Sequence, residues 1–532
     1  MQSSATYLTY NKTNSFSSLV LDYLDGRDEL KIFYQHPPTV EGVKAAMEQR
    51  KAFKNHRTLL VDVLKEQYKN ISLTEKQQTN LSLLANENTF TICTAHQPNI
   101  FTGHLYFIYK ILHAVKIAED LSVKIPDANF VPVYYMGSED ADLEELGHIF
   151  INGQKYEWKT DQTGAVGRMK VDKALLQLIE LFNGQLTVLP HGQIIVDLMR
   201  RCYTLNATIE QATFKLVNEL FASFGLLILL PDSSILKQAF VPVMEKELLE
   251  GFSHKAVEAT VAILPPAYKA QASGREINLF YLMDNSRERI ELVNGQWSIV
   301  NSEKIFSQEG ILKELHEYPE RFSPNVILRP VFQETILPGV VFIGGGGEIA
   351  YWMELKKVFE AADVPYPILV LRNSFVLIEK NDAAIIRKLQ LSYEEIFMTE
   401  FDLMNKLVKR DSSVQVTLDE EKDQLLSYYN RLKAIAGAVD ATLQPHTEAL
   451  YTRALKKINE LEKKLLRAEK KKFDAEQRQL QKMKAHLFPN NNLQERVENM
   501  MLFYAKWGDD FLKNLYNHSL SLEQEFGIIE EQ

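Results

Sequence analysis

The chain has 532 residues and an ordinary globular composition, with 45% hydrophobic and 24% charged residues, so we expect two or more structural units. A net charge of −10 argues against a general nucleic-acid coat protein. The two cysteines cannot form a disulfide framework or a four-cysteine zinc site. The first residues lack the basic-then-apolar plan of a signal peptide, and no apolar run reaches the roughly 20 residues that span a bilayer. The composition therefore predicts a cytoplasmic protein without membrane contact.

Short apolar strands and helices alternate along the middle of the chain. Residues 1–88 look helical and polar, and we expect them to pack on a core. From Phe90 onward the alternation is typical of a buried parallel sheet in an α/β protein. A helix predicted over 104–121 joins the first two strands in a βαβ unit. The predicted strands are 89–94, 130–136, 193–196, 226–230, 340–343 and 368–371.

Two segments are expected to interrupt this sheet. Residues 251–325 have a looser pattern with polar turns and hairpin-like alternation near 289–295, which indicates a connecting insertion. A smaller insertion is expected at about 145–200. The first half of the core would then span 89–250, and the second half 326–385.

The remainder of the chain is predicted to be helical. Residues 386–487 should form an antiparallel coiled-coil arm, suited to dimerisation or to closing over a site, and 488–532 a tail that docks on the core. Residues 453–484 carry twelve Lys or Arg against five Asp or Glu, which fits either a solvated coiled-coil face or a patch that meets RNA or nucleotide. The 4-3-4-3 spacing of a coiled-coil seam is present at Ala454, Ile458, Leu461, Leu465 and Ala468.

A polar loop follows the first predicted strand. In open α/β sheets, a strand, a loop with Pro and Gly, and then a helix present backbone N–H groups and a positive helix end to phosphate. We expect this loop and the start of its helix to bind nucleotide or substrate, with His96 also catalytic. The predicted residues are His96, Gln97, Asn99, Thr102, Gly103, His104 and Tyr106.

Four consecutive glycines, Gly344, Gly345, Gly346 and Gly347, follow a later strand and precede Glu348 at a helix start. Glycines let the backbone approach a ligand closely, and Glu348 could accept a ribose hydroxyl. No Gly-Lys-Ser/Thr follows, so the motif is not a P-loop. The alternative is a tight strand–helix turn in which a carboxylate is merely favourable at the helix N-terminus.

Two acidic residues, Glu139 and Asp140, follow the second predicted strand, at the sheet end where ligands bind. They could hold an ammonium group or Mg²⁺, or accept a proton from an amine nucleophile, and we predict that they are catalytic. The alternative is an acidic helix start capped by Ser138.

Arg372 follows a late strand and could meet phosphate or carboxylate, although a structural ion pair accounts for it equally well. Arg329 is a lesser candidate of the same kind.

Three of these stretches, 95–110, 131–148 and 329–356, resemble the cysteine ligases of bacillithiol biosynthesis, and 487–499 fits as well. The resemblance implies a Rossmann-like core with inserted connecting segments and a C-terminal α-helical coiled coil that pairs two protomers into a homodimer. It also implies the last step of bacillithiol biosynthesis, in which L-cysteine is joined to the amine of glucosaminyl-malate through an amide bond.

A wider resemblance suggests how such a ligase would use ATP. Residues 98–104 are similar to the HIGH region of class I aminoacyl-adenylate enzymes, with Phe101 in place of the first His. Residues 344–348 are similar to the adenosine-binding turn of cysteinyl-tRNA synthetase and of the mycothiol cysteine ligase. Those relatives select cysteine through zinc, whereas the isolated Cys93 and Cys202 predict no metal site here. The expected cofactor is ATP with Mg²⁺.

The main hypothesis is therefore an ATP-dependent ligase, with ATP lying across the 96–104 loop and the 344–348 turn. The glucosamine amine would be positioned near Glu139 or Asp140. Two alternatives belong to other classes: a non-catalytic dimeric scaffold that binds nucleotide, and an RNA-binding synthetase relative that uses the basic arm. The acidic net charge disfavours the second of these.

Overall fold

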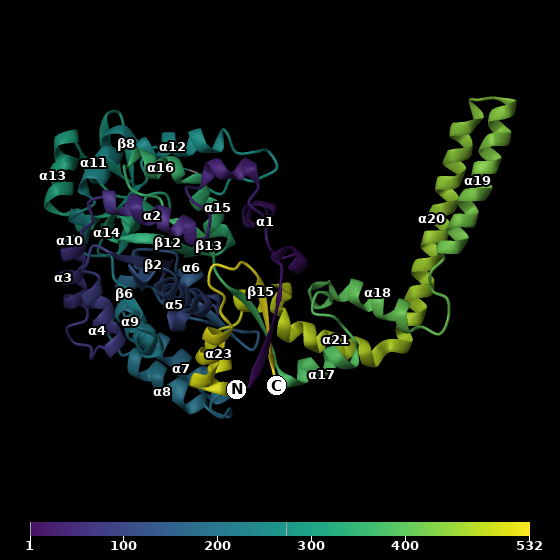
Figure 1. Cartoon of the computed structure of the whole chain (residues 1–532), viewed down its shortest axis with the longest axis horizontal. Coiled ribbons are helices and arrows are strands. Elements are labelled where there is room, and N and C mark those ends of the chain that lie inside the picture. The colour runs from purple at the N-terminus through teal and green to yellow at the C-terminus, as the bar shows by residue number, and fades with distance from the viewer. Residues whose placement is uncertain (1, 273) are drawn as a thin grey trace. The chain divides into compact units, whose positions relative to one another are not determined.

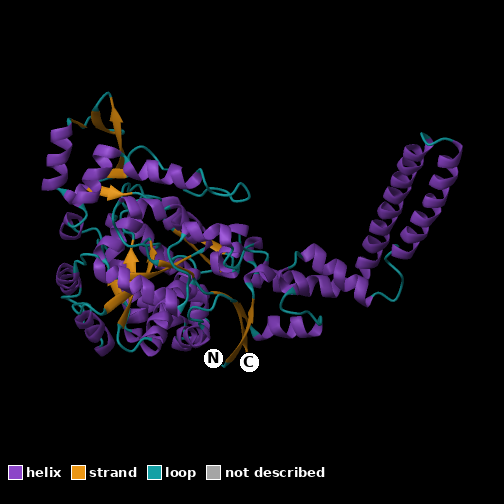
Figure 2. Ribbon diagram, turned by 45° about the horizontal axis from the view of Figure 1, so that its top comes forward, coloured by secondary structure: helices purple, strands orange, loops and turns teal. Residues whose placement is uncertain are grey.

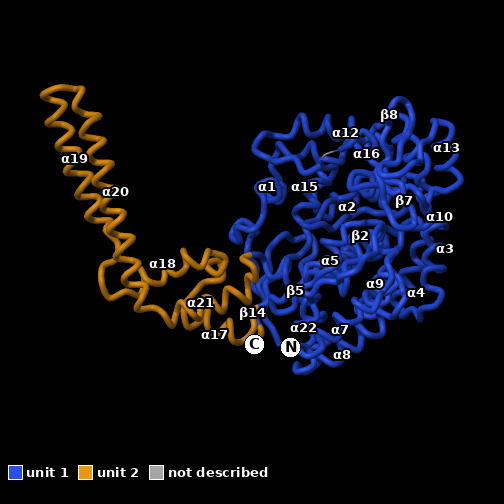
Figure 3. Tube along the Cα trace, turned by 180° about the vertical axis from the view of Figure 1, so that it is seen from behind, with its two compact units in different colours: residues 1–377, 492–530, 532 blue, residues 378–491, 531 orange. Residues whose placement is uncertain are grey.

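The computed structural model describes residues 2–272 and 274–532, which form two compact units (Figure 3). Unit 1 contains the chain up to Leu377 together with Asn492–Glu530, and unit 2 contains Ile378–Asn491. None of the helices in these described residues is long and apolar enough to cross a membrane.

Unit 1 is built on a five-stranded parallel sheet, coloured with the other strands in Figure 2. Counted along the chain, its strands lie in the order 3-2-1-4-5, which is the order of a Rossmann-type sheet. The predicted Rossmann-like parallel core is confirmed. The strands, from one edge to the other, are β6 (Leu227–Leu229), β3 (Asn129–Met136), β2 (Thr89–His96), β12 (Gly339–Gly344) and β13 (Ile368–Leu371).

The central strands are buried along almost their whole length, which is why they form continuous apolar runs in the sequence. Helix α5 (Tyr106–Lys124) connects β2 with β3, and both α5 and α2 (Val40–Ala52) contribute to the apolar core of the sheet. That core includes Val43 of α2, Ile92 of β2, Ala114 of α5 and Val341 of β12. The strands run parallel, with one register shift where β12 begins beside β2, so their carboxyl ends meet at one edge of the sheet.

The segment between β6 and β12 forms a second sheet of five antiparallel strands. The predicted hairpin is present between β8 (Ser286–Val293) and β9 (Gln296–Ile299), and its turn residues Asn294 and Gly295 both have positive φ. The other strands are β7 (Leu279–Met283), β10 (Ile305–Phe306) and β11 (Phe322–Pro324), with helices α12 (Phe252–Val261) and α13 (Gln308–Glu317) nearby in the chain.

One predicted strand is wrong. Residues 193–196 lie in helix α8 (Gly192–Cys202), not in a strand. The β-branched pair Ile195 and Val196 suggested a strand, but the buried positions continue to Met199 and Cys202 at helical spacing. The 145–200 segment thus holds a short β4–β5 hairpin (His148–Ile151 and Gln154–Glu157) followed by helices α7 (Lys173–Leu186) and α8.

The first 88 residues are mainly helical, as expected, but they begin with strand β1 (Ser3–Leu8). It belongs to a three-stranded sheet of order β1-β15-β14, with β15 at Phe526–Glu531 and β14 at Ser374–Ile378. The two ends of the chain therefore lie side by side (Figure 1). The remaining helices of unit 1 are α1 (Ser18–Leu24), α3 (Arg57–Gln67), α4 (Glu75–Leu83), α6 (Leu143–Leu146), α9 (Ile209–Phe221), α10 (Ser234–Gln238), α11 (Val241–Glu250), α14 (Arg329–Ile336), α15 (Gly346–Glu354), α16 (Lys356–Ala361), α22 (Met500–Trp507) and α23 (Asp509–His518).

Unit 2 is helical and contains the predicted coiled coil. Helices α19 (Asp419–Val439) and α20 (Leu443–Lys470) form an antiparallel hairpin (Figure 1). Two ion pairs connect them, Lys422–Glu462 at 2.9 Å and Lys433–Glu448 at 3.1 Å. Later residues of α19 thus pair with earlier residues of α20, as antiparallel helices require. The other helices of the unit are α17 (Lys380–Lys388), α18 (Glu400–Asp411) and α21 (Asp474–Leu487).

Candidate functional site

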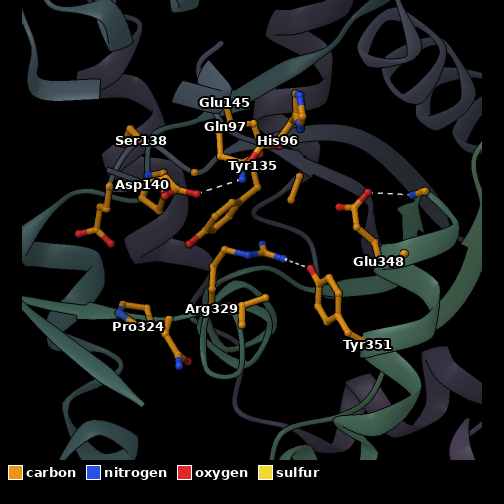
Figure 4. Close-up of a pocket in the computed structure, with 18 of the residues that line it drawn as sticks. His96, Gln97, Tyr135, Ser138, Asp140, Glu145, Pro324, Arg329, Glu348 and Tyr351 are labelled. Carbon is orange, nitrogen blue, oxygen red and sulfur yellow. Dashed lines mark hydrogen bonds between the residues drawn. The ribbon is translucent and has the colours of Figure 1, made fainter. Parts of the chain in front are cut away.

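A cavity of about 620 Å³ opens at the carboxyl ends of the parallel strands, beside the point between β2 and β12 where the strand order reverses. Ligands of open α/β sheets bind at this point. Its wall combines the turns after β2, β3 and β12 with side chains from the inserted sheet (Figure 4). Arg496 of the C-terminal segment also lines it. The sequence-predicted residues that line it are His96, Gln97, Tyr106, Glu139, Asp140, Gly345, Gly346, Gly347, Glu348 and Arg372.

The other predicted residues do not line the cavity. They are Asn99, Thr102, Gly103, His104 and Gly344. The loop is instead held in place by the C-terminal segment, because the Asn499 amide donates hydrogen bonds to the carbonyls of Phe101 (2.9 Å) and Gly103 (2.5 Å). Gly103 has φ of +63°, and a Cβ there would lie 2.7 Å from that of Asn99. Glycine is therefore required by the turn itself, and these positions shape the site from outside its wall.

The turns after β2 and β3 are tied together by two predicted residues. The Gln97 side-chain amide donates to Oδ2 of Asp140 at 3.0 Å (Figure 4). The helix that follows is capped by Asp142, which accepts from the backbone N–H of Glu145, and not by Ser138. Ser138 instead lines the cavity with a buried hydroxyl that has no partner among the described residues. Through its hydrogen bond with Gln97, Asp140 thus holds the turns after β2 and β3 together in the cavity wall.

His96 is a neutral member of the wall. Burial lowers its pKa well below the usual range, and the positive charge of Lys110 lowers the pKa further. Its Nε2 is buried without a hydrogen-bond partner among the described residues, and its ring packs edge-on against Tyr106 at 5.5 Å. His96 can therefore make one hydrogen bond to a ligand, but it supplies no positive charge to a phosphate at neutral pH.

Glu348 stabilises the glycine turn through a hydrogen bond to its backbone. Its Oε2 accepts from the backbone N–H of Gly345 at 2.8 Å, so the carboxylate caps α15, as the alternative interpretation of this motif expected. The same oxygen pairs with Lys110 Nζ at 2.5 Å. Lys110 also donates to the carbonyl of Ala95 at 2.9 Å, which joins the end of β2 to the turn after β12.

The cavity wall is rich in arginine. Arg372 forms an ion pair with Glu495 at 2.7 Å, and its guanidinium lies 4.9 Å from the centre of the Tyr106 ring. The structural ion pair, one of the two interpretations given for Arg372, is therefore present, and the side chain also lines the cavity. The other cationic side chains of the wall are Lys110, Arg275, Arg287, Arg329 and Arg496.

Three of these arginines, Arg275, Arg329 and Arg496, have no carboxylate within ion-pair distance among the residues that the structure describes. Arg329 makes only neutral contacts, donating to Gln333 at 3.1 Å and to the Tyr351 hydroxyl at 3.3 Å (Figure 4). A guanidinium without a counter-ion in a cavity is suited to a carboxylate or phosphate. The wall is therefore receptive to anions.

Glu139 is the buried carboxylate of the wall. It forms an ion pair with Lys237 of α10, and its Oε2 accepts from the Ser323 hydroxyl at 3.1 Å. Burial raises the pKa of Glu139, while the positive charge of Lys237 acts in the opposite direction. Neither Lys110 nor Lys237 was predicted from the sequence. A lysine within the apolar run of α5 could have indicated that Lys110 has a special role. The sequence around Lys237 contains no comparable indication.

Fold and site together define a Rossmann-type α/β protein with an anion-receptive ligand cavity at the switch point of its sheet. The family model for the N-terminal Rossmann-like domain of bacillithiol biosynthesis BshC matches residues 3–373. The model for the C-terminal coiled-coil domain of the same family matches residues 375–531. The chain belongs to the BshC family of bacillithiol biosynthesis.

Several relatives match along nearly the whole chain, each named "putative cysteine ligase BshC". The Flavobacterium johnsoniae protein is 38% identical over 524 residues, covering 98% of this chain and 99% of the relative. The Flavobacterium psychrophilum protein is 39% identical and covers 98% of each chain. The Christiangramia forsetii protein is 36% identical, again covering 98% of each.

Proposed function

We propose that this protein is an ATP-dependent ligase that joins L-cysteine to the amine of glucosaminyl-malate through an amide bond. The observation that carries the proposal is the placement of three unpaired arginines and the buried carboxylate Glu139 around one cavity at the switch point of the sheet. A ligase of this kind must hold phosphate and carboxylate groups beside a group that accepts a proton. The name of the relatives supplies the cysteine, and the description of the family supplies the pathway.

The glycine turn fits the phosphates of ATP. Helix α15 begins at Gly346 beside the cavity, and a helix N-terminus offers unpaired N–H groups to phosphate. Apart from its chain neighbours and its own helix backbone, no atom of the described residues lies within 4 Å of the position where a Cβ would stand on Gly347, so a ligand can approach its backbone. Among the described residues no group of three or more His, Cys, Asp or Glu is placed to hold a metal. Mg²⁺ would then be held largely by the phosphates it arrives with.

The acceptor amine is assigned to the Glu139 side of the cavity. A raised carboxylate pKa suits proton transfer near neutral pH. The unpaired arginines can bind the carboxylates of an acidic acceptor and of cysteine. His96, neutral and unpartnered, contributes a hydrogen bond rather than charge.

The proposal is tested by incubating the purified protein with cysteine, glucosaminyl-malate and ATP, and measuring the amide product by mass spectrometry. We expect Glu139→Gln to lower kcat by about 10²–10⁴-fold, the usual contribution of a positioned proton acceptor. Release of AMP would indicate an adenylate intermediate, and release of ADP an acyl-phosphate. The exposed carboxylate variant Glu144→Gln serves as a control with expected wild-type turnover. Nucleotide binding without any cysteine-dependent product would contradict the ligase and favour a scaffold.

We also propose that the α19–α20 hairpin pairs two protomers. Apolar side chains on both helices are exposed in the single chain, including Ile435 (58% exposed) and Leu461 (50% exposed). Helical surfaces of this kind are covered when coiled coils associate. Sedimentation velocity should give about twice the chain mass of 61.2 kDa for the wild type.

The double variant Ile435→Glu/Leu461→Glu should sediment as a single chain, because it would place charges in the apolar interface. Lys456→Glu, an exposed position on α20, is the matched control and should leave the dimer intact. A wild-type protein that sediments as one chain at micromolar concentration would overturn the dimer.

A further inference from the structure

Four charged side chains form a row from the exposed Arg168 to Glu139 in the cavity wall. Arg168 donates to both carboxylate oxygens of Asp232, at 2.7 and 2.8 Å. Oδ1 of Asp232 lies 3.8 Å from Nζ of Lys237, and Lys237 forms an ion pair with Glu139. Asp232 and Lys237 follow strand β6, and Glu139 follows the neighbouring strand β3. The row thus connects two adjacent carboxyl ends of the sheet.

Lys237 is the most deeply buried member of this row. It is 0% exposed, and its third contact is the backbone carbonyl of Glu320, at 3.2 Å. A buried ammonium is costly unless it is paired and hydrogen-bonded. Its contacts are made with Glu139, Asp232 and the Glu320 carbonyl, and Lys237 itself does not line the cavity. It can therefore act on a ligand only through Glu139.

The inserted sheet holds the other oxygen of Glu139. Ser323 of β11 donates to Oε2 at 3.1 Å, and the Ser323 oxygen accepts from Nε of Arg287 at 3.0 Å. Arg287 lines the cavity and donates again to the carbonyl of Pro324 at 3.1 Å. One donor therefore contacts each oxygen of Glu139, Lys237 at Oε1 and Ser323 at Oε2, and a carboxylate oxygen retains a second lone pair for a ligand.

We propose that Lys237 is a positioning residue that keeps Glu139 ionised and fixed in the cavity wall, so that Glu139 accepts the proton of the acceptor amine. This inference rests on the proposed function. As the new C–N bond forms, the bond from the cysteine carbonyl carbon to the phosphate oxygen breaks. The attacking nitrogen loses its proton to the Glu139 carboxylate, which returns it to solvent after the product leaves.

The charges around Glu139 set the sign of the expected pH effect. The groups that face it from the packed elements are Lys237 of α10, Asp232 after β6, Arg168 of the 166–168 turn, Glu210 of α9, Arg287 of β8, Tyr135 of β3 and the adjacent Asp140. Lys237 is the largest influence that favours the ionised form. Its removal leaves Asp232 and Glu210 opposing ionisation, so the pKa of Glu139 must rise.

The test is the pH profile of kcat for Lys237→Met. We expect its acidic limb to move to higher pH by about one unit or more, because an opposite charge at this range shifts a carboxylate by about 1–3 units. Activity should be partly recovered at high pH, where Glu139 ionises again. Ser323→Ala, which removes the hydrogen bonds of Ser323 with Glu139 and Arg287 but no charge, should move the limb in the same direction by less. It provides the test if Lys237→Met does not fold. A uniform loss at every pH, with no movement of the limb in either variant, would overturn the proposal.

A second readout does not depend on turnover. In Lys237→Met the folded-state pKa of Glu139 lies further above its ordinary value of 4.5, so ionisation opposes folding and the melting temperature should fall as pH rises from about 5 to 8. The double variant Lys237→Met/Glu139→Gln should lack this fall. If the fall is seen but no cysteine ligation occurs in the wild type, the ion-pair assignment stands and the proposed function fails. If ligation occurs and the double variant melts like the single one at every pH, the positioning role is wrong.

Discussion

Replacement of Arg50 by Met is expected to lower the free energy of unfolding by about 3–5 kcal/mol, because it leaves Glu334 buried without its counter-ion. Arg50 is 1% exposed, and its guanidinium pairs with the Glu334 carboxylate at 2.7 Å. It also donates to the backbone carbonyls of Glu334 (2.7 Å) and Gly339 (2.9 Å). Since β12 begins at Gly339, this one side chain secures α2 to the strand that carries the glycine turn.

The measurement is urea denaturation of the full chain, with two comparisons. The double variant Arg50→Met/Glu334→Gln should regain about 2 kcal/mol over the single variant, because it contains no unpaired buried charge. Lys51→Met, at the next position of α2, breaks only an exposed pair with Glu48 and should cost less than about 0.5 kcal/mol. A double variant that is no more stable than Arg50→Met would contradict the buried ion pair as the source of the loss.

The largest effect on the binding of an anionic substrate group is expected from Arg329→Met. Loss of a charge-assisted contact costs about 1.5–3 kcal/mol, which corresponds to about a 10- to 150-fold fall in kcat/KM. Arg329 contributes this contact because its guanidinium faces the cavity and forms no ion pair with any described residue, its hydrogen bonds going to Gln333 and Tyr351. Arg329→Lys should recover part of the loss, since it restores the charge but not the forked geometry.

Steady-state kinetics with each substrate varied in turn will show which anion Arg329 binds. The fall should appear in the KM of one substrate if the contact forms in the ground state, and in kcat if it forms only in the transition state. Arg289→Met on β8 is the matched control, because Arg289 is 45% exposed and pairs with Glu291. A kcat/KM within about threefold of the wild type for every substrate would remove Arg329 from the site.

The sheet could be predicted from sequence because its strands are short, apolar and separated by helices. Phe90, Ile92 and Val131 lie in strands that are buried on both faces, and short apolar runs between helices are typical of such strands. The order of the strands was not predictable, because β12 pairs with β2 at a sequence separation of about 250 residues, as in the pairing of Val341 with Ile92. The same limit applies to β1 and β15, because β15 lies between β1 and β14, and these three strands come from distant parts of the chain.

The site was predictable where its residues directly follow a strand. Gln97, Glu139 and Asp140 lie at carboxyl ends of the sheet, and topology brings such positions together. Arg275 and Arg496 come from the inserted segment and the C-terminal segment, so nothing in their local sequence indicates that they meet at one cavity. The loop at 99–104 is conspicuous in the sequence for its polar side chains, yet its conformation is determined by tertiary partners such as Asn499.

Crystallography with a non-hydrolysable ATP analogue and L-cysteine tests the central claim most directly. We expect the triphosphate over the start of α15, at Gly346 and Gly347, with the amino-acid carboxylate bound by one of the unpaired arginines Arg275, Arg329 or Arg496 and space beside Glu139 for the acceptor amine. A nucleotide bound elsewhere on the chain, with this cavity empty, would contradict the assignment of the ligation site.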